Sequence, residues 1–225
     1  MEGKLIVIEG LDGSGKSTQE ELLKQKLNAC GLKINFIKLP IYDDPACELV
    51  KMYLSGRFGS KPEDVNAYAA SAFFAVDRYV SFNCYWKEAY KKGEIFLADR
   101  YTTSNAYHQL TKTDRKDWDS YLEWLEDFEY NKMGIPKPDA VIYLDMPIEV
   151  SQKLMTGRYK GDESKKDIHE KNIDYLNNCR VAANYACVKL GWKRIECSSN
   201  GEPLPVDVIS DAVTNAVAEA IGIEL

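Results

Sequence analysis

The chain has 225 residues, 45% of them hydrophobic, which fits a single α/β domain with a sizeable core. Its net charge of −6 argues against a duplex nucleic-acid partner, because such binding draws on a broad basic surface. No apolar run is long enough to span a membrane, and the N-terminal segment lacks the pattern of a secretion signal. We therefore expect one domain over residues 1–225, in the cytoplasm, with its six scattered cysteines reduced.

Short apolar segments alternate along the chain with longer segments of helical periodicity. The predicted strands are residues 4–8, 34–39, 95–98, 140–144 and 192–196. The predicted helices are residues 16–29, 46–54, 63–91, 113–132, 148–155, 168–190 and 206–221. Several of the strands are continuously apolar, which is typical of parallel strands that are covered on both faces. Right-handed crossovers between them predict a doubly wound parallel sheet in three layers.

A polar segment at residues 156–167 separates two of the predicted helices. It contains two glycines, Arg158 and several lysines. A solvated loop would account for this composition. Its place after the fourth predicted strand favours a lid, over about residues 156–169, that closes over a ligand.

Residues 10–18 read GLDGSGKST and join the first predicted strand to the first predicted helix. The string matches the P-loop pattern G-x-x-x-x-G-K-[ST] in the context that this motif requires. Backbone N–H groups at the glycines and at the helix N-terminus can surround phosphate oxygens. Lys16 is predicted to bridge the β- and γ-phosphates of a nucleotide, and Ser17 to ligate Mg²⁺. The other predicted nucleotide contacts in this loop are Gly10, Gly13, Ser14, Gly15 and Thr18.

An Asp-Arg pair follows the third predicted strand, at the edge where doubly wound sheets bind ligands. Asp99 can hold the water shell of Mg²⁺ and Arg100 can clamp a phosphate, with an ordinary surface ion pair as the alternative. Upstream, Phe74 and Arg78 are four residues apart and share a helix face. A ring that stacks on a base, beside a guanidinium that donates to its carbonyl, would read a pyrimidine, although phenylalanine on a helix is more often a core residue.

Together these motifs resemble the thymidylate kinase family. The residues that carry the resemblance are the segment 9–18, Phe74, Arg78, the segment 99–101, Ser104, the segment 143–145 and Pro147. The resemblance extends from residue 5 to about residue 185. It implies a five-stranded parallel P-loop fold, a homodimer, and transfer of the γ-phosphoryl group of ATP to dTMP with Mg²⁺.

The resemblance also implies roles for individual residues. Asp12 would contact the 3′-hydroxyl of the sugar and help to place the phosphates. Phe74 would stack on thymine, and Arg78 would bond its carbonyl. Arg100 would hold the acceptor phosphate, and Arg158 would be the lid arginine over the ATP phosphates. The remaining positions that it marks as substrate contacts are Leu39, Tyr42, Tyr101, His108 and Gln109.

Three positions depart from the family pattern. Gly13 stands where many members have an arginine, so that charge must come from the lid. Tyr42 stands where many members have an arginine after the Leu-Pro that ends the second strand, and its hydroxyl can reach a phosphate without bringing charge. His108 stands where the family commonly has an aromatic residue near the sugar.

Two other classes of function remain open at this point. A kinase for a deoxynucleoside, or for another monophosphate, shares these motifs, but a hydroxyl acceptor needs a carboxylate base near the end of the second strand. That strand ends in Leu39 and Pro40, with Asp43 and Asp44 only later. A P-loop switch would carry an Asp-x-x-Gly segment after an apolar strand, whereas residues 99–102 read DRYT. A phosphate acceptor is already ionised near neutral pH and needs no general base.

Overall fold

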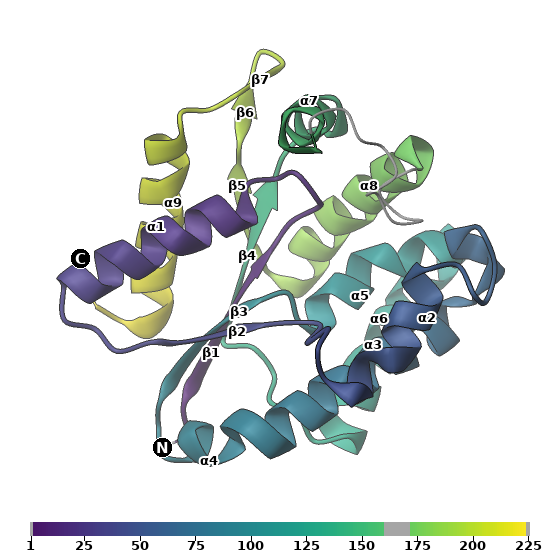
Figure 1. The fold of residues 1–225 in the computed structure, drawn as a ribbon, viewed down its shortest axis with the longest axis horizontal. Helices are drawn as coiled ribbons and strands as arrows, with labels where there is room; N and C mark the ends of the chain where they lie inside the picture. The colour runs from purple at the N-terminus through teal and green to yellow at the C-terminus, as the bar shows by residue number, and fades with distance from the viewer. Residues whose placement is uncertain (1, 160–171, 224–225) are drawn as a thin grey trace.

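A computed structural model describes residues 2–159 and 172–223 of the chain. Its centre is a five-stranded parallel sheet with helices on both faces (Figure 1), as predicted. The strands are β1 (Lys4–Glu9), β2 (Asn35–Lys38), β3 (Ile95–Asp99), β4 (Ala140–Asp145) and β5 (Lys193–Glu196). Their order across the sheet is β2-β3-β1-β4-β5, so β1 lies in the middle.

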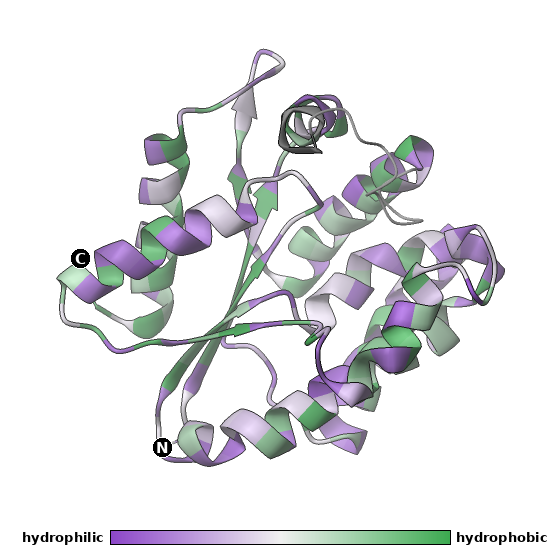
Figure 2. Ribbon diagram, in the orientation of Figure 1, coloured by the Kyte–Doolittle hydropathy of each residue, from purple (hydrophilic) through white to green (hydrophobic). Residues whose placement is uncertain are grey.

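Successive side chains of the central strand β1 enter two separate hydrophobic clusters. Ile6 and Ile8 pack on one face of the sheet with residues of α1 (Lys16–Ala29) and α9 (Val206–Ile221). Leu5 and Val7 pack on the other face with aromatic residues from the segment 82–90. All four β1 side chains are buried, and each contributes about 1.5–3 kcal/mol. Figure 2 shows the strands as mainly hydrophobic where the two helical layers cover them.

The second helical layer is larger than the first. It contains α3 (Ala67–Ser81), α4 (Lys87–Lys91), α5 (Thr102–His108), α6 (Trp118–Glu126) and α8 (Ile173–Leu190). Tyr143 of β4 packs against residues of α5, α6 and α8 in one cluster. Of two further helices, α7 (Ile148–Tyr159) lies near the carboxyl end of β4, and α2 (Glu48–Leu54) lies beside α3 (Figure 1).

The register of the sheet brings the ends of three strands together. Asp99 at the end of β3 pairs with Ile8 of β1 on one side and with Lys38 of β2 on the other. The loop that follows β1 therefore begins beside the residues that follow β2 and β3. This common edge is where a doubly wound sheet binds its ligands.

Two predicted helices are divided in the structure. The prediction for residues 63–91 covers a 3₁₀ turn (Pro62–Asp64), α3, a π-helical turn (Phe82–Trp86) and α4. Here α3 begins only after Asn66, because the Asn66 side chain accepts a hydrogen bond from the N–H of Ala69. The prediction for residues 113–132 covers a 3₁₀ turn (Arg115–Asp117), α6 and a second π-helical turn (Asp127–Lys132), and a further 3₁₀ turn (Leu110–Lys112) precedes them.

Other helix boundaries follow from local caps. The helix α2 follows a 3₁₀ turn (Pro45–Cys47), which Asp44 caps by accepting from the N–H of Ala46. The helix α8 begins after Asn172, whose side chain accepts from the N–H of Tyr175. Residues 160–171 lie outside the described residues, and with them most of the predicted lid 156–169 and the start of the predicted helix 168–190.

Two elements were not predicted. The helix α5 follows β3 directly, and its residues other than Ser104 are buried although the sequence is mostly polar. A small hairpin joins β6 (Ser198–Ser199) to β7 (Glu202–Pro203) through Asn200 and Gly201, which both have positive φ angles, of 52° and 78°. Within the described ranges, no helix combines the length and apolar character that crossing a membrane requires.

Candidate active site

Two cavities meet at the carboxyl edge of the sheet. The larger one, about 710 Å³, runs along the P-loop and the start of α1, and the smaller one, about 300 Å³, lies against α3 and α5. The residues that line both cavities are Asp12, Leu39, Pro40, Tyr42 and Arg100. Ligands in the two cavities would therefore meet beside Arg100. The P-loop and Arg100 face one cleft, which the function predicted from the sequence requires.

The glycines of the P-loop hold backbone conformations that other residues adopt at a cost. Gly10 has a φ of 154°, and a Cβ at this position would lie 2.5 Å from the Ser14 hydroxyl oxygen. Gly15 precedes α1 with a φ of 92° and offers no side-chain cap to the helix. The first turn has no side-chain cap, and although the Thr18 N–H donates to the Gly15 carbonyl oxygen, the N–H groups of Lys16 and Ser17 are left for an anion. The larger cavity is lined by the predicted nucleotide contacts Gly13, Ser14, Gly15, Lys16, Ser17 and Thr18.

The structure gives a physical reason for Gly13. A Cβ here would lie 2.8 Å from both the Ser151 carbonyl oxygen and the Met155 Cγ. Both residues belong to α7, which packs against the loop. An arginine at this position would have to displace that helix. The packing of α7 against the loop therefore excludes an arginine at position 13.

Lys16 lies over the P-loop with its side chain buried. Its ammonium donates to the carbonyl oxygens of Gly10, at 2.6 Å, and of Leu11, at 3.2 Å. Burial, followed by the charge of Arg100, lowers the pKa of Lys16 to about 8. A phosphate beside this ammonium would favour its charged form.

Asp99 and Ser17 line the larger cavity together, and both carry oxygen atoms of the kind that Mg²⁺ prefers. One oxygen of the buried Asp99 carboxylate, Oδ2, accepts from Lys38 Nζ at 3.1 Å. The other, Oδ1, is buried without a hydrogen-bond partner. A buried carboxylate oxygen of this kind fits a water of a metal's hydration shell. Sequence reasoning did not identify Lys38 as the partner of Asp99.

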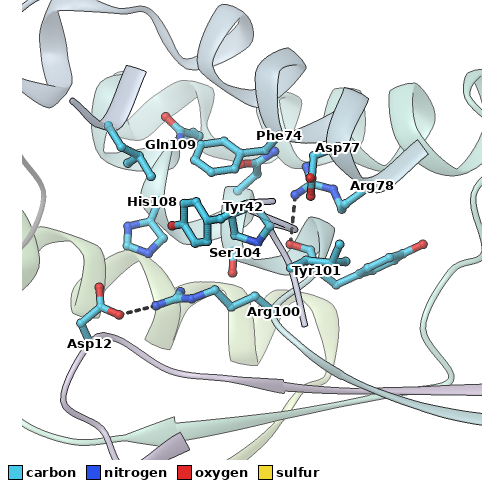
Figure 3. Close-up of a pocket in the computed structure, with 14 residues that line it drawn as sticks. Asp12, Tyr42, Phe74, Asp77, Arg78, Arg100, Tyr101, Ser104, His108 and Gln109 are labelled. Carbon is cyan, nitrogen blue, oxygen red and sulfur yellow. Dashed lines mark hydrogen bonds and ion pairs between the residues drawn. The ribbon is translucent and has the colours of Figure 1, made fainter. Parts of the chain in front are cut away.

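Arg100 follows Asp99 in a strained conformation. Its φ is 71°, in the left-handed region that non-glycine residues rarely adopt. Its Nη2 donates to Asp12 Oδ1 at 2.5 Å (Figure 3), and its Nη1 donates to the Tyr107 hydroxyl at 3.2 Å. This backbone turn directs the guanidinium across the junction of the two cavities, where functional sites commonly store such strain.

A buried carboxylate fixes the loop that carries Arg100. Glu9, at the end of β1, accepts from the hydroxyl groups of Thr103 at 2.6 Å, Ser104 at 2.9 Å and Tyr107 at 2.7 Å. It also accepts from the backbone N–H of Tyr101. These bonds explain how the polar helix α5 can be buried. From the sequence, Glu9 was identified only as the first residue of the segment 9–18, and no role was predicted for it.

The smaller cavity has an aromatic wall and a donor wall. Phe74 lines it from α3 and is held edge-on by the ring of Tyr53, with the ring centroids 6.2 Å apart. Arg78 and Gln109 line it as well (Figure 3). Gln109 is fully buried, and neither its amide nitrogen nor its amide oxygen has a hydrogen-bond partner. Arg78 is paired with Glu129, a residue that sequence reasoning missed because it is distant in the chain.

Three other predicted substrate contacts, Leu39, Tyr42 and His108, also line the cavities. Leu39 and the half-exposed Tyr42 line both cavities, and the Ile41 N–H donates to the Asp77 carboxylate, which ties their loop to α3. His108 is buried and lines the smaller cavity, with the Tyr175 ring stacked against it.

Tyr101 contributes to the site through its backbone. Its ring points away from the other labelled rings (Figure 3), and its hydroxyl donates to the Pro136 carbonyl oxygen. Its own carbonyl oxygen accepts from Arg78 Nη1 at 3.4 Å. The Tyr101 hydroxyl is therefore already engaged within the protein.

The far wall of the larger cavity is apolar and was not predicted. It is formed by Met146, Leu154, Met155, Pro203, Leu204, Val206 and Ile209. Two of these residues, Pro203 and Leu204, come just after the turn of the small hairpin. The predicted catalytic residue Arg158 falls in the last turn of α7, and its side chain lies outside the described residues.

Comparisons with known proteins agree on one family. The sequence model of the family described as thymidylate kinase matches residues 8–203. The chain is 28% identical to a thymidylate kinase of Mycobacterium tuberculosis, covering 84% of this chain and 87% of the relative. It is 26% identical to human thymidylate kinase, covering 98% and 96%.

A solved structure shares the fold. It is a thymidylate kinase from Candida albicans, with a TM-score of 0.68 and 20% sequence identity, and the match covers 98% of this chain and 93% of that one. The family match and the relatives extend over most of the chain, P-loop and Asp-Arg segment included. The chain belongs to the thymidylate kinase family, whose members are nucleoside monophosphate kinases.

Proposed function

We propose that this protein transfers the γ-phosphoryl group of ATP to dTMP, giving ADP and dTDP. The observation that carries the proposal is the meeting of the two cavities at Asp12 and Arg100. One cavity offers a P-loop for the donor phosphates, and the other offers an aromatic face and amide groups for a base. In-line transfer between two phosphates needs such positioning and charge neutralisation more than covalent help.

The donor is proposed to lie along the larger cavity. Backbone N–H groups of the P-loop and the Lys16 ammonium would hold its phosphates, and the apolar wall that includes Met155 and Leu204 would receive adenine. Ser17 and Asp99 would hold Mg²⁺, which neutralises charge on the phosphate oxygens when it is bound. We retain Arg158 as the proposed lid arginine on the basis of the family resemblance.

The acceptor is proposed to lie in the smaller cavity. Thymine would stack on Phe74 with its polar edge toward Arg78 and Gln109, and the sugar would lie near Asp12 and His108. The acceptor phosphate would take the place of Asp12 on the Arg100 guanidinium, because a phosphate can accept two parallel hydrogen bonds from it. Arg100 would thereby align the attacking oxygen with the donor.

The carboxylates of the smaller cavity favour a phosphate acceptor over a sugar hydroxyl. Among the described residues that line it, the carboxylates are Asp12 and Asp77. Asp77 accepts from the Ile41 N–H, and Asp12 is paired with Arg100. Neither therefore stands as a general base poised for a nucleoside hydroxyl. An ionised phosphate needs no such base.

A panel of monophosphates tests the proposed function directly. Purified protein with ATP and Mg²⁺ would be offered dTMP, dUMP, dCMP, dGMP, AMP and thymidine in parallel, with product masses read by mass spectrometry. We expect dTDP and an equal amount of ADP with dTMP. ADP formation that does not depend on an added acceptor would favour a P-loop switch, and phosphorylation of thymidine alone would favour a deoxynucleoside kinase.

Replacing Phe74 with leucine is expected to raise the KM for dTMP by about tenfold, because base-aromatic stacking is lost while apolar volume is largely kept. The KM for ATP should stay near its wild-type value. Phe73 is the matched control: it is the neighbouring ring on α3, packs on Phe58 and Tyr53, and does not line the cavity. If the Phe73→Leu variant raises the KM for dTMP as much, stacking on Phe74 is wrong. Steady-state kinetics with both substrates varied provide the measurement.

We also propose that the protein is a homodimer. Tyr68, Val76 and Tyr79 leave an apolar stripe on α3 exposed, with relative exposures of 47%, 39% and 42%. A light-scattering mass equal to that of one chain at micromolar concentration would contradict this assignment. The cytoplasmic location stays a prediction from the sequence.

A further inference from the structure

Arg78 and Glu129 form a buried ion pair behind the smaller cavity. Arg78 Nε and Nη2 each donate to one oxygen of the Glu129 carboxylate at 2.6 Å, and the two side chains are 4% and 0% exposed. The pair joins α3 to the π-helical turn Asp127–Lys132. Fork-to-fork bonds of this kind fix the plane of the guanidinium as well as its position.

The carboxylate is itself held in place. The Thr102 hydroxyl donates to Glu129 Oε2 at 2.8 Å, and the Asn105 amide lies 3.4 Å from Oε1. Both donors belong to α5, so a third element restrains the pair. With Nε and Nη2 engaged, Nη1 is the nitrogen that remains for the cavity, and its contact with the Tyr101 carbonyl oxygen is long, at 3.4 Å.

The two polar groups beside the proposed base differ in what they can recognise. The Gln109 amide can turn over and present either a donor or an acceptor, and its two polar atoms have no partner in the protein. A guanidinium can only donate. Arg78 is therefore the group able to distinguish a carbonyl oxygen on a pyrimidine ring from an amino group. Arg78 makes this distinction only if its guanidinium is held in place and cannot turn away from a base that carries an amino group instead.

The pairing also determines which arginine receives the phosphate. Arg78 and Arg100 are the two arginines among the described residues that line the smaller cavity. Glu129 is fully buried and neutralises Arg78, whereas Asp12, the partner of Arg100, is 30% exposed and can be displaced by a ligand. An arginine whose charge is already neutralised is suited to bind an uncharged base. An arginine whose partner can be displaced is suited to bind a phosphate. The base and the phosphate of a nucleotide would thus bind to different arginines.

We propose that Glu129 is a positioning residue that locks Arg78 as a fixed donor, so that the site selects monophosphates of 4-oxo pyrimidines over those of 4-amino pyrimidines. The inference rests on the proposed function, because it requires the base to lie in the smaller cavity. It assigns selectivity to the pair rather than to Arg78 alone. Glu129 itself would not touch the substrate.

The test is the equilibrium binding of dTMP, dUMP and dCMP to the Glu129→Gln variant, measured by calorimetry without ATP. Glutamine keeps the shape but can accept only one of the two bonds from Arg78, which frees the guanidinium to turn. We expect the ratio of the dCMP Kd to the dTMP Kd to fall by about tenfold or more, as loss of a charged hydrogen bond implies. The Kd for ATP should not change.

Tyr121→Phe is the matched control. Its hydroxyl bonds to Ser71 at 2.7 Å and links α3 to α6, the helix that leads into the π-helical turn of Glu129, without contacting Arg78. We expect this variant to keep the wild-type Kd ratio. A folded Glu129→Gln variant that keeps the ratio, or that weakens both nucleotides equally, would overturn the proposal, because either result means a purely structural role.

Two further results separate the possible failures. If Glu129→Gln does not fold because Arg78 is left as a buried unpaired charge, the double variant Arg78→Gln, Glu129→Gln replaces the pair without that charge. Its Kd ratio should approach one, and an unchanged ratio would overturn the proposal. If the wild-type protein phosphorylates dTMP and these ratios do not move, only the inference fails. If the wild-type protein binds no pyrimidine monophosphate, the proposed function fails first.

Discussion

Replacing Lys16 with methionine is expected to lower kcat by about 10²–10³-fold, the loss typical when one preorganised charge is removed from a transition state. The Lys16 ammonium now bonds to the carbonyl oxygens of Gly10 and Leu11. A donor nucleotide would place its β- and γ-phosphates against the same ammonium. Methionine keeps the length of the stem and removes only the charge and its donors.

The pKa of Lys16 supplies a second readout for the same variant. Burial lowers this pKa to about 8, and bound phosphates raise it again. Well below pH 8 the ammonium carries its proton with and without ATP, so binding takes up no proton at this group. At about pH 9 the ligand-free side chain is mostly neutral, so ATP binding takes up a proton and the affinity falls as the pH rises.

Calorimetry at pH about 9 in two buffers of different ionisation enthalpy measures this uptake. The wild-type protein should take up a proton on binding ATP, and Lys16→Met should take up none. The thermal midpoint without nucleotide checks that the variant is folded. Equal proton uptake in both proteins would show that another group titrates, and an unchanged kcat would contradict the role of Lys16 in transfer.

The layout of the sheet could be predicted from the sequence because its three central strands, β1, β3 and β4, are buried on both faces and read as continuous apolar segments. The predicted strands match the five observed ones to within a residue or two at their ends, and α9 spans the predicted residues 206–221. The P-loop was equally clear, since its glycine spacing has few other structural uses. The fold class followed from these features, and the family followed from the P-loop together with Phe74, Arg78 and the Asp-Arg segment; the comparisons confirm both.

The polar interior of the site could not be predicted in the same way. The helix α5 is buried but mostly polar, so it lacks the apolar period that indicates a helix. Its hydroxyl groups donate hydrogen bonds to the carboxylates of Glu9 and Glu129. No local sequence pattern predicts partners that are so distant in the chain. Glu129 is 51 residues from Arg78 and lies on a π-helical turn, where helical spacing no longer predicts which face a side chain occupies.

Other features left a signal that could have been used. Asn200 and Gly201 form the Asn-Gly pair that favours a two-residue hairpin, and they join β6 to β7 as that pair predicts. The hairpin then leads Pro203 and Leu204 into the wall of the larger cavity. Recognition of the hairpin would have indicated that the residues after the turn reach the edge of the sheet.

Replacing Arg100 with glycine is expected to lower kcat/KM for dTMP by about 10²–10³-fold while leaving the fold at least as stable as in the Arg100→Ala variant. Both substitutions remove the guanidinium that lines the two cavities, so both should lose activity to the same degree. They differ only in the backbone. At a φ of 71°, alanine pays the left-handed penalty of about 1 kcal/mol that glycine avoids.

Urea unfolding of the two variants isolates this backbone strain from the chemistry. The free energy of unfolding should be about 1 kcal/mol higher for Arg100→Gly than for Arg100→Ala, with equal denaturant slopes. A protein that keeps its stability and loses turnover would show that the chain tolerates strain at position 100 in order to direct a guanidinium toward the acceptor. Equal free energies of unfolding for the two variants would show that the backbone at position 100 is not strained. If either keeps wild-type activity toward dTMP, Arg100 does not hold the acceptor phosphate, because nothing else among the described residues at the junction offers a comparable fork of donors.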